Sequence, residues 1–221
     1  MRRLEVELLG RVPYADAWAL QRSLAERRKR GETCDRLLLV EHPHVLTLGR
    51  NGRRENILAA PERLRQLGVE IHEIDRGGDI TYHGPGQIVG YPIVDLREWK
   101  RDVVAYVRAI EESIIAALAR FGIDSFAEPG ATGVWTREGK ICAIGVHISR
   151  WVTTHGFALN WKTDLSYFGL IVPCGLHKPV TSMEALGVDV PLEAVHEAVA
   201  GEFVRSFGYE ALIIAAAASA A

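Results

Sequence analysis

Five strand-like runs lie in the middle of the chain with only one long helical pattern among them, and this order limits the folds available. The runs are Asp79 to Tyr82, Gln87 to Val94, Thr132 to Thr136, Ile141 to Ile148 and Thr153 to Trp161. Glu138-Gly139, between two of them, is typical of a hairpin turn. A doubly wound parallel sheet needs helices that alternate with strands. We therefore expect an α+β fold, with a mixed β-sheet flanked by helices.

The flanking segments carry weaker patterns. Leu4, Val6 and Leu8 alternate with polar residues, as on a half-buried strand. Further strands are predicted at Leu37 to Val40, Val45 to Leu48 and Val69 to Ile74. Apolar periodicity, proline at starts and glycine after ends predict helices at 13–31, Pro61 to Leu67, Asp102 to Phe121, Thr181 to Leu186 and Pro191 to Phe207. The alanine-rich stretch from Ile213 to Ala221 is expected to fray.

Bulk properties exclude several classes of protein. A length of 221 residues without repeats or linkers favours one domain over residues 1–221. The net charge of −2 argues against nucleic acid as a partner. No apolar run approaches the roughly 20 residues of a membrane span, and the N-terminus lacks the apolar core of a signal peptide. Three widely spaced cysteines predict neither disulfides nor a metal site, which fits a cytoplasmic protein.

One basic run, Arg27-Arg28-Lys29-Arg30, lies at the end of the first predicted helix. It has two interpretations. The first is a solvated face whose charges complement the helix C-terminal dipole. The second is a docking patch for an acidic protein.

The segment from Arg76 to Gln87 contains four glycines and one proline in twelve residues. Glycine permits close approach of backbone to a ligand, and Arg76, Tyr82 and His83 add polar groups. The composition alone leaves a structural hairpin and a binding loop equally open. The segment is neither GxGxxG nor a Walker loop, so it does not indicate a nucleotide phosphate site.

Cys174 lies between Pro173 and Gly175 after an apolar run, where a chain reversal can present its sulfur in a cleft. The alternative is a small buried side chain, the commonest fate of an unpaired cysteine. Cys142 lies within an apolar strand and is expected to pack, and Cys34 to be incidental. A nucleophilic thiol needs a nearby cation or base. The candidates are Lys140, His83, His147, His155 and His177, although a lysine directly after a hairpin turn is ordinarily solvated.

Several motifs, in order along the chain, resemble those of the lipoyl(octanoyl) transferase family. Arg76 to Tyr91 is similar to that family's RGGxxTYHGPGQxxxYP signature almost residue for residue. Cys142 stands where the family more often has alanine, which would place a second thiol near the site. The other matches are Glu41 to Arg50 with EHPxVxTLG, Gly139 to Val146 with GKIAAIGV, His155 to Asn160 with HGxALN, Ile171 to Gly175 with IxPCG and Thr181 to Met183 with TS[ML].

This resemblance implies roles for individual residues and the fold of the biotin- and lipoate-protein ligase catalytic domain. Cys174 would carry the acyl group as a thioester, and Lys140 would stabilise its thiolate and act as general acid and base. The glycines would let backbone approach the acyl chain, so a methyl added at Gly78 or Gly156 should obstruct the pocket without unfolding the protein. The acyl pocket would be lined by Arg76, Gly77, Gly78, Asp79, Ile80, Thr81, Tyr82, His83, Ala143, Ile144, Gly145, Gly156, Phe157 and Ala158.

The implied activity is the first step of protein lipoylation. The donor would be octanoyl-acyl carrier protein. The acceptors would be lysines of the lipoyl domains of 2-oxoacid dehydrogenase E2 subunits and of the glycine cleavage H protein. Exchange between thioesters is close to thermoneutral, so neither ATP nor a cofactor is expected. The enzyme is expected to be a monomer. An apolar tunnel with Ile144 and Phe157 would select a medium chain, because each buried methylene contributes roughly 0.8 kcal/mol.

Two rival functions remain. A lipoate- or biotin-protein ligase would share the fold but activate a free acid with ATP, and Arg76 to Gln87 lacks the basic GRGRxGR-type loop of biotin ligases. A catalytically silent module would only hold an acyl or lipoyl group, against which the combination of Cys174 and Lys140 speaks.

Overall fold

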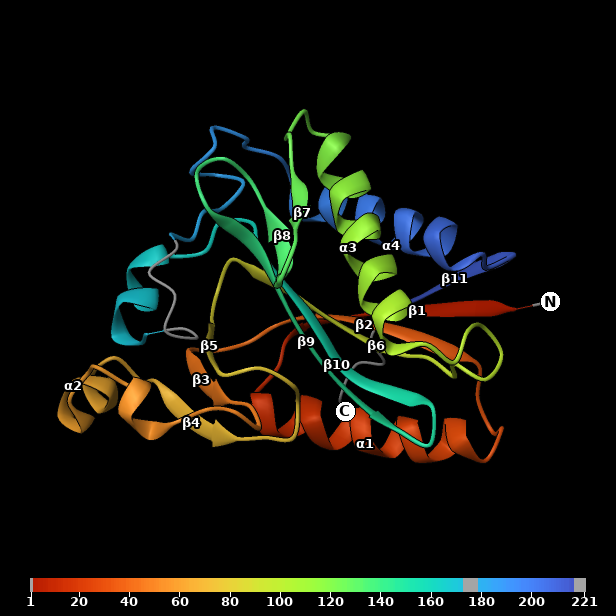
Figure 1. Ribbon diagram of the computed structural model, residues 1–221, viewed down its shortest axis with the longest axis horizontal. Helices are drawn as coiled ribbons and strands as arrows, with labels where there is room; N and C mark the ends of the chain where they lie inside the picture. The colour runs from red at the N-terminus through yellow and green to blue at the C-terminus, as the bar shows by residue number, and fades with distance from the viewer. Residues whose placement is uncertain (1, 173–178, 217–221) are drawn as a thin grey trace.

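A mixed β-sheet forms the centre of the molecule (Figure 1). The computed structural model describes residues 2–172 and 179–216. The strands of this sheet are β1 (Arg3–Arg11), β2 (Asp35–Glu41), β6 (Gln87–Ile93), β7 (Phe126–Glu128), β8 (Ala131–Trp135), β9 (Lys140–Ser149), β10 (Val152–Asn160) and β11 (Ala211–Ala216). They lie in the order β11-β1-β2-β6-β10-β9-β8-β7. β1 is parallel to both of its neighbours and the other pairs are antiparallel, which confirms the predicted mixed sheet.

A second, three-stranded sheet lies beside the first. It contains β3 (Val45–Leu48), β4 (Glu70–Glu73) and β5 (Ile80–His83), in the order β4-β3-β5. The short helix α2 (Pro61–Gln66) and two 3-10 turns, η1 (Arg54–Asn56) and η2 (Leu165–Leu170), complete this part of the molecule. Its own small core is built around Leu46, Leu64 and Tyr82. Because β5 leads directly into β6, the glycine-rich segment connects the two sheets.

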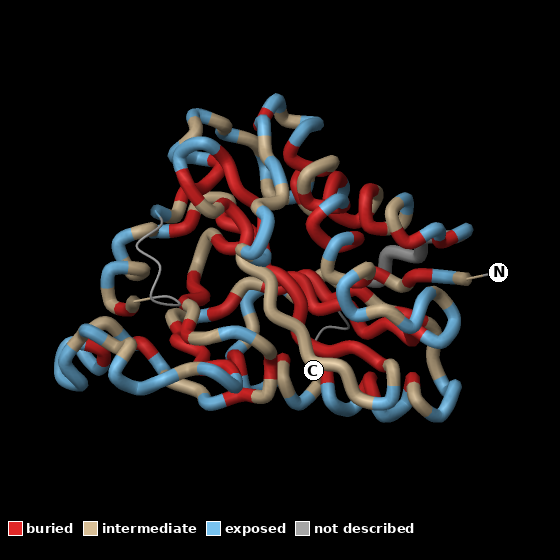
Figure 2. Tube along the Cα trace, viewed as in Figure 1, coloured by how far each residue is buried: buried red, intermediate tan, exposed pale blue. Residues whose placement is uncertain are grey.

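Three long helices cover the main sheet on both faces (Figure 1). α1 (Tyr14–Lys29) packs on one face, where it contacts β6 and β10. α3 (Val103–Ala119) and α4 (Leu192–Phe207) pack together on the other face over the largest core cluster. The Asp102 side chain caps α3 by accepting a hydrogen bond from the Ala105 N–H at 3.0 Å. Buried residues concentrate along the central strands and the helix faces turned toward them (Figure 2).

In the basic run at the end of α1, Arg27 and Arg30 are exposed as the solvated-face interpretation expects, whereas Arg28 has a structural role that neither interpretation anticipated. Arg28 is buried, and its guanidinium pairs with Asp35 at 2.8 Å, Glu98 at 2.7 Å and Asp95 at 3.6 Å. Asp95 also pairs with Arg97. This network ties the end of α1 to β2 and to the segment after β6. Arg28 is therefore part of neither a solvated face nor a docking patch.

Two predicted segments differ from the structure. The stretch from Thr181 to Leu186 forms hydrogen-bonded turns instead of a helix. The N–H groups of Met183 and Glu184 donate to the carbonyls of Asn160 and Trp161 at the end of β10, so they are unavailable for continuing a helix. The alanine-rich end was expected to fray, yet residues 211–216 form β11 beside β1.

Two features are absent from residues 2–172 and 179–216. No helix there is long and apolar enough to cross a membrane. Among the same residues, no cluster of three or more His, Cys, Asp or Glu side chains has the arrangement needed to hold a metal ion.

Candidate active site

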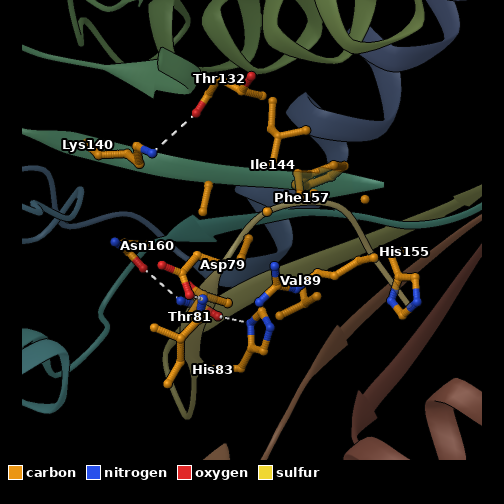
Figure 3. Close-up of a pocket in the computed structure, with 18 of the residues that line it drawn as sticks. Asp79, Thr81, His83, Val89, Thr132, Lys140, Ile144, His155, Phe157 and Asn160 are labelled. Atoms are coloured by element: carbon orange, nitrogen blue, oxygen red, sulfur yellow. Dashed lines mark hydrogen bonds between the residues drawn. The ribbon is translucent and has the colours of Figure 1, made fainter. Parts of the chain in front are cut away.

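A cavity of about 330 Å³ lies where β9 and β10 face the glycine-rich segment (Figure 3). Its walls come from both sheets, from α1 and from η2. The lining residues that the sequence motifs singled out are Arg76, Gly78, Asp79, Ile80, Thr81, His83, Lys140, Ala143, Ile144, Gly145, Gly156, Phe157 and Ala158. The lining residues that sequence reasoning did not assign to the pocket are Tyr14, Gln87, Val89, Tyr91, Gly130, Ala131, Thr132, His155, Asn160, Phe168 and Val180.

Lys140 begins β9 and borders the cavity. Its ammonium donates a hydrogen bond to the Thr132 carbonyl at 3.2 Å and lies 4.6 Å from the centre of the Trp135 ring. Both contacts come from β8, which pairs with β9 through the predicted hairpin turn. The lysine is therefore held over an aromatic face by its neighbouring strand, in contrast to an ordinary solvated hairpin lysine.

Cys174 and His177 lie outside the described residues. The described residues on both sides of that gap belong to the site. Phe168 and Val180 line the cavity. The N–H of Lys140 donates to the Pro179 carbonyl at 2.9 Å, and the Thr181 N–H donates to the Lys140 carbonyl at 3.0 Å. The backbone of Lys140 itself thus anchors the chain that follows the gap.

The glycine-rich segment is fixed by its polar side chains. Arg76 donates to the carbonyl and the hydroxyl of Thr47 at 2.7 and 3.0 Å, which joins the segment to β3. The Asp79 carboxylate accepts hydrogen bonds from the Asn56 side-chain amide at 2.8 Å and the Ile80 N–H at 2.7 Å. These bonds hold the cavity wall in one conformation.

A buried hydrogen-bond chain crosses the cavity floor. His83 Nδ1 donates to Gln87 Oε1 at 2.8 Å, and Gln87 Nε2 donates to Asn160 Oδ1 at 2.9 Å. Asn160 Nδ2 then donates to the Thr181 carbonyl at 2.9 Å. Burial, and next to it the neighbouring His42, lower the pKa of His83 to about 3, so its imidazole is neutral near pH 7. The chain links the glycine-rich segment to the residues beyond the gap.

Two residues expected in the pocket wall do not line the cavity. Tyr82 is fully buried in the small core, where its hydroxyl lies 2.8 Å from His44 Nδ1 and its ring stacks on Tyr167. Alternation along β5 turns it away from the neighbouring lining residues Thr81 and His83. Gly77 uses its N–H to bond the Val146 carbonyl at 2.9 Å.

Gly156 and Gly78 are required by the geometry of the backbone around them more clearly than by the shape of the cavity. A β-carbon on Gly156 would lie 2.2 Å from the Gly90 carbonyl oxygen and 2.5 Å from Pro92 Cδ. Gly78 has a φ of +87°, a left-handed conformation that strains other residues. The geometry therefore contradicts the expectation of an undisturbed fold at Gly156, and at Gly78 a methyl would strain the backbone.

The cavity also has a polar end, far from Lys140. His155 Nε2 donates to Asp75 Oδ1 at 2.8 Å, and its Nδ1 lies 3.5 Å from the Tyr14 hydroxyl. Nearby, the Tyr91 hydroxyl donates to His42 Nε2 at 2.8 Å. Burial lowers the pKa of His155, although the bond to Asp75 opposes that shift. His147, another candidate base, lies 3.5 Å from the same aspartate and does not line the cavity.

The two described cysteines differ from a reactive thiol. Cys142 is fully buried in β9, and burial raises the pKa of its thiol. Cys34 is half-buried, and burial followed by the neighbouring Glu5 raises its pKa. Neither is poised as a thiolate near neutral pH.

Known proteins resemble this chain over most of its length. Residues 13–204 match the family model of the lipoyl protein ligase A/B catalytic domain. The chain is 58% identical over 220 residues to the octanoyltransferase of Solibacter usitatus (strain Ellin6076), with 100% of both chains covered. It is 52% identical over 221 residues to the octanoyltransferase of Acidobacterium capsulatum, with 92% of this chain and 90% of the relative covered.

Solved structures share the fold at low sequence identity. A lipoate-protein ligase A bound with ATP superposes with a TM-score of 0.79 at 17% identity, over 99% of this chain and 90% of that one. A biotin protein ligase from Aquifex aeolicus, in complex with biotin and ATP, gives 0.55 at 13% identity, over 94% and 71% of the two chains. These likenesses confirm the expected ligase-type catalytic fold.

Proposed function

Since this chain belongs to the lipoyl protein ligase A/B family and, within it, to the octanoyltransferases, we propose that it transfers an octanoyl group through a thioester on Cys174. The donor is octanoyl-acyl carrier protein, and the acceptor is a lysine of a lipoyl domain. The acceptor proteins are the E2 subunits of 2-oxoacid dehydrogenases and the glycine cleavage H protein. The reaction is cytoplasmic and the enzyme acts as a monomer.

The first step exchanges one thioester for another. The Cys174 sulfur attacks the acyl carbonyl, the carbon–sulfur bond to the carrier breaks, and the octanoyl group remains on Cys174. Lys140 holds the proton of the Cys174 thiol as an ammonium and gives it to the departing carrier thiol, which leaves the lysine uncharged for the second step. The bond that forms and the bond that breaks are of the same kind, so no ATP is consumed.

The second step forms the amide. The uncharged amine of the acceptor lysine attacks the Cys174 thioester, and the carbon–sulfur bond breaks as the carbon–nitrogen bond forms. The amine loses a proton to Lys140, and the proton passes to the departing Cys174 sulfur. Amide formation from a thioester is downhill, so this step makes the transfer irreversible.

The observation that carries the proposal is the position of Lys140. Its ammonium borders a cavity with the apolar side chains Ile144 and Phe157 in its wall (Figure 3). Its backbone also bonds to Pro179 and Thr181, directly after the segment that contains Cys174. A lysine in this position can exchange a proton first with a thiol and then with an amine.

The test is intact mass spectrometry of the purified chain after incubation with octanoyl-acyl carrier protein without ATP. We expect a mass increase of one octanoyl group, mapped to the Cys174 peptide, and its loss when a lipoyl domain is added. Cys174→Ala should abolish both events, whereas Cys142→Ala should preserve them. Acylation of Cys142 or Cys34 in the unaltered chain, or a requirement for ATP, would overturn the proposal.

A further inference from the structure

We infer that Tyr14 and His155 close the distal end of the cavity and thereby set the longest acyl chain that the enzyme accepts. This inference rests on the proposed function, because it concerns the same acyl group. It assigns chain-length selection to buried polar groups at one end of the cavity, in addition to the apolar wall.

The geometry of the β9–β10 hairpin places this end at a defined distance from Lys140. His155 pairs with Val146, six residues along β9 from Lys140. At about 3.4 Å per residue, the two positions lie roughly 20 Å apart along the strands, and Figure 3 shows the two side chains on opposite sides of the cavity. An octanoyl chain has seven carbon–carbon bonds and spans roughly 9 Å when extended. The Lys140 side chain runs toward His155, because its ammonium bonds to the Thr132 carbonyl, which lies beyond the Val134–Cys142 pair on the side of Val146. Since that side chain spans roughly 6 Å, roughly 14 Å remains, which an octanoyl chain of roughly 9 Å and a histidine side chain of roughly 5 Å together fill.

The cavity changes character between these ends. Its middle is lined by apolar side chains, among them Val89, Ile144 and Phe157. At the far end, Tyr14 and His155 are buried and in contact with each other, and His155 also bonds to Asp75. Additional methylenes would have to separate Tyr14 from His155, and these two buried groups would lose their contact without water to replace it. Polar groups that a wrong substrate leaves unpaired discriminate much more strongly than an apolar wall does.

The backbone at His155 supports a functional role. Its φ is +56°, although it is not glycine and lies inside β10. Such a conformation persists only where surrounding contacts hold it, and strained residues of this kind cluster at functional sites. Here the His155 N–H donates to the Gln21 side chain at 2.8 Å, and the imidazole is held by Asp75. These contacts fix the imidazole at the end of the cavity.

The left-handed backbone also allows a clean test, because glycine suits it. His155→Gly removes the imidazole and relieves the strain together. Arg150→Gly is the matched control, since Arg150 has a φ of +51° in the turn between β9 and β10, is exposed and does not line the cavity. Tyr14→Phe removes only the hydroxyl and keeps the ring that packs on the sheet.

The experiment measures kcat/KM for octanoyl-, decanoyl- and dodecanoyl-carrier protein with each purified full-length variant, together with its melting temperature. We expect the ratio of decanoyl to octanoyl transfer to rise about tenfold in His155→Gly and about threefold in Tyr14→Phe. Arg150→Gly should keep the ratio of the unaltered chain. If His155→Gly fails to fold, Tyr14→Phe decides the question.

The outcomes distinguish a failure of this inference from a failure of the proposed function. Unchanged ratios in folded His155→Gly and Tyr14→Phe, with normal octanoyl transfer, would overturn the inference alone. Absence of octanoyl transfer by the unaltered chain would overturn the proposed function instead.

Discussion

The Lys140 ammonium lies 4.6 Å from the centre of the Trp135 ring, and both side chains belong to the β8–β9 hairpin. A lysine side chain has four rotatable bonds, so its ammonium can reach many positions unless other groups hold it. The ring and the Thr132 carbonyl hold it at the edge of the cavity.

We therefore expect Trp135→Leu to slow octanoyl transfer. A cation–π contact of this kind is worth about 1 kcal/mol, which corresponds to a roughly fivefold lower rate of acylation. Trp135→Phe keeps an aromatic face and should recover part of the rate. Single-turnover acylation, followed by mass spectrometry, measures the effect. Equal rates in Trp135→Leu and the unaltered chain would show that the ring does not position the lysine.

Thiol reactivity should distinguish the three cysteines. Cys142 is fully buried, and Cys34 is half-buried with its pKa raised, so both should react slowly with a small alkylating reagent at neutral pH. One fast phase is expected, mapped to Cys174. Cys174→Ala should remove it, Cys142→Ala should keep it, and Lys140→Met should slow it and move its pH profile upward. A profile that does not move in Lys140→Met would argue against thiolate stabilisation by the lysine.

Glycine substitutions should separate backbone packing from pocket lining. Gly156→Ala places a methyl against the Gly90 carbonyl, so we expect a loss of about 2 kcal/mol or more in the free energy of unfolding. Gly77→Ala is the matched control, because its nearest neighbour would be the Val146 carbonyl at an ordinary contact distance of 3.4 Å. Urea denaturation compares the two variants. Equal stability of both would mean that the sheet adjusts at Gly156.

Stability should fall as the solution becomes acidic. Burial lowers the pKa of His42 to about 4, and burial with the nearby His42 lowers that of His83 to about 3. In the unfolded chain both titrate near 6.5, so below that pH the unfolded state binds more protons and stability decreases. The contribution of the two neutral histidines to the free energy of unfolding is fully present above pH 6.5 and is lost progressively toward pH 4.

The check is urea denaturation between pH 7.5 and pH 4.5. Each histidine contributes at most about 1.4 kcal/mol per pH unit to the slope. His42→Gln keeps hydrogen-bonding groups but does not titrate, so its stability should depend less steeply on pH. A slope identical to that of the unaltered chain would exclude His42 as a source of the dependence.

Local patterns predicted most of the fold because each element carries its own periodicity. The bounds of β3 coincide with the apolar run from Val45 to Leu48, and α3 follows its Asp102 cap. β11 could not be predicted in this way. Its sequence, Ala-Leu-Ile-Ile-Ala-Ala, has no alternation of apolar and polar residues, and residues 211–216 are ordered by backbone bonds to β1, almost the whole chain away.

The site was predictable only where it is contiguous in sequence. Separate motifs indicated Lys140 and most of the glycine-rich segment, since the residues within each motif are neighbours along the chain. Tyr14 and Tyr91 were not assigned to it. In the sequence, Tyr14 looks like any other buried residue on the apolar face of a helix. Tyr91 is the last residue of its motif, and the motif gives it no evident role. Only the packing of α1 against β6 and β10 brings both to the same cavity.

The pairing of β1 with β11 has a consequence for synthesis on the ribosome. β1 can pair with β2 soon after both are translated, but its other edge waits for residues 211–216, which are translated after every other strand of the sheet. An unpaired strand edge is a template for pairing with another nascent chain. A message that stops shortly before codon 211 would release a product with all the motifs of the site and an open sheet edge, and such a product should aggregate.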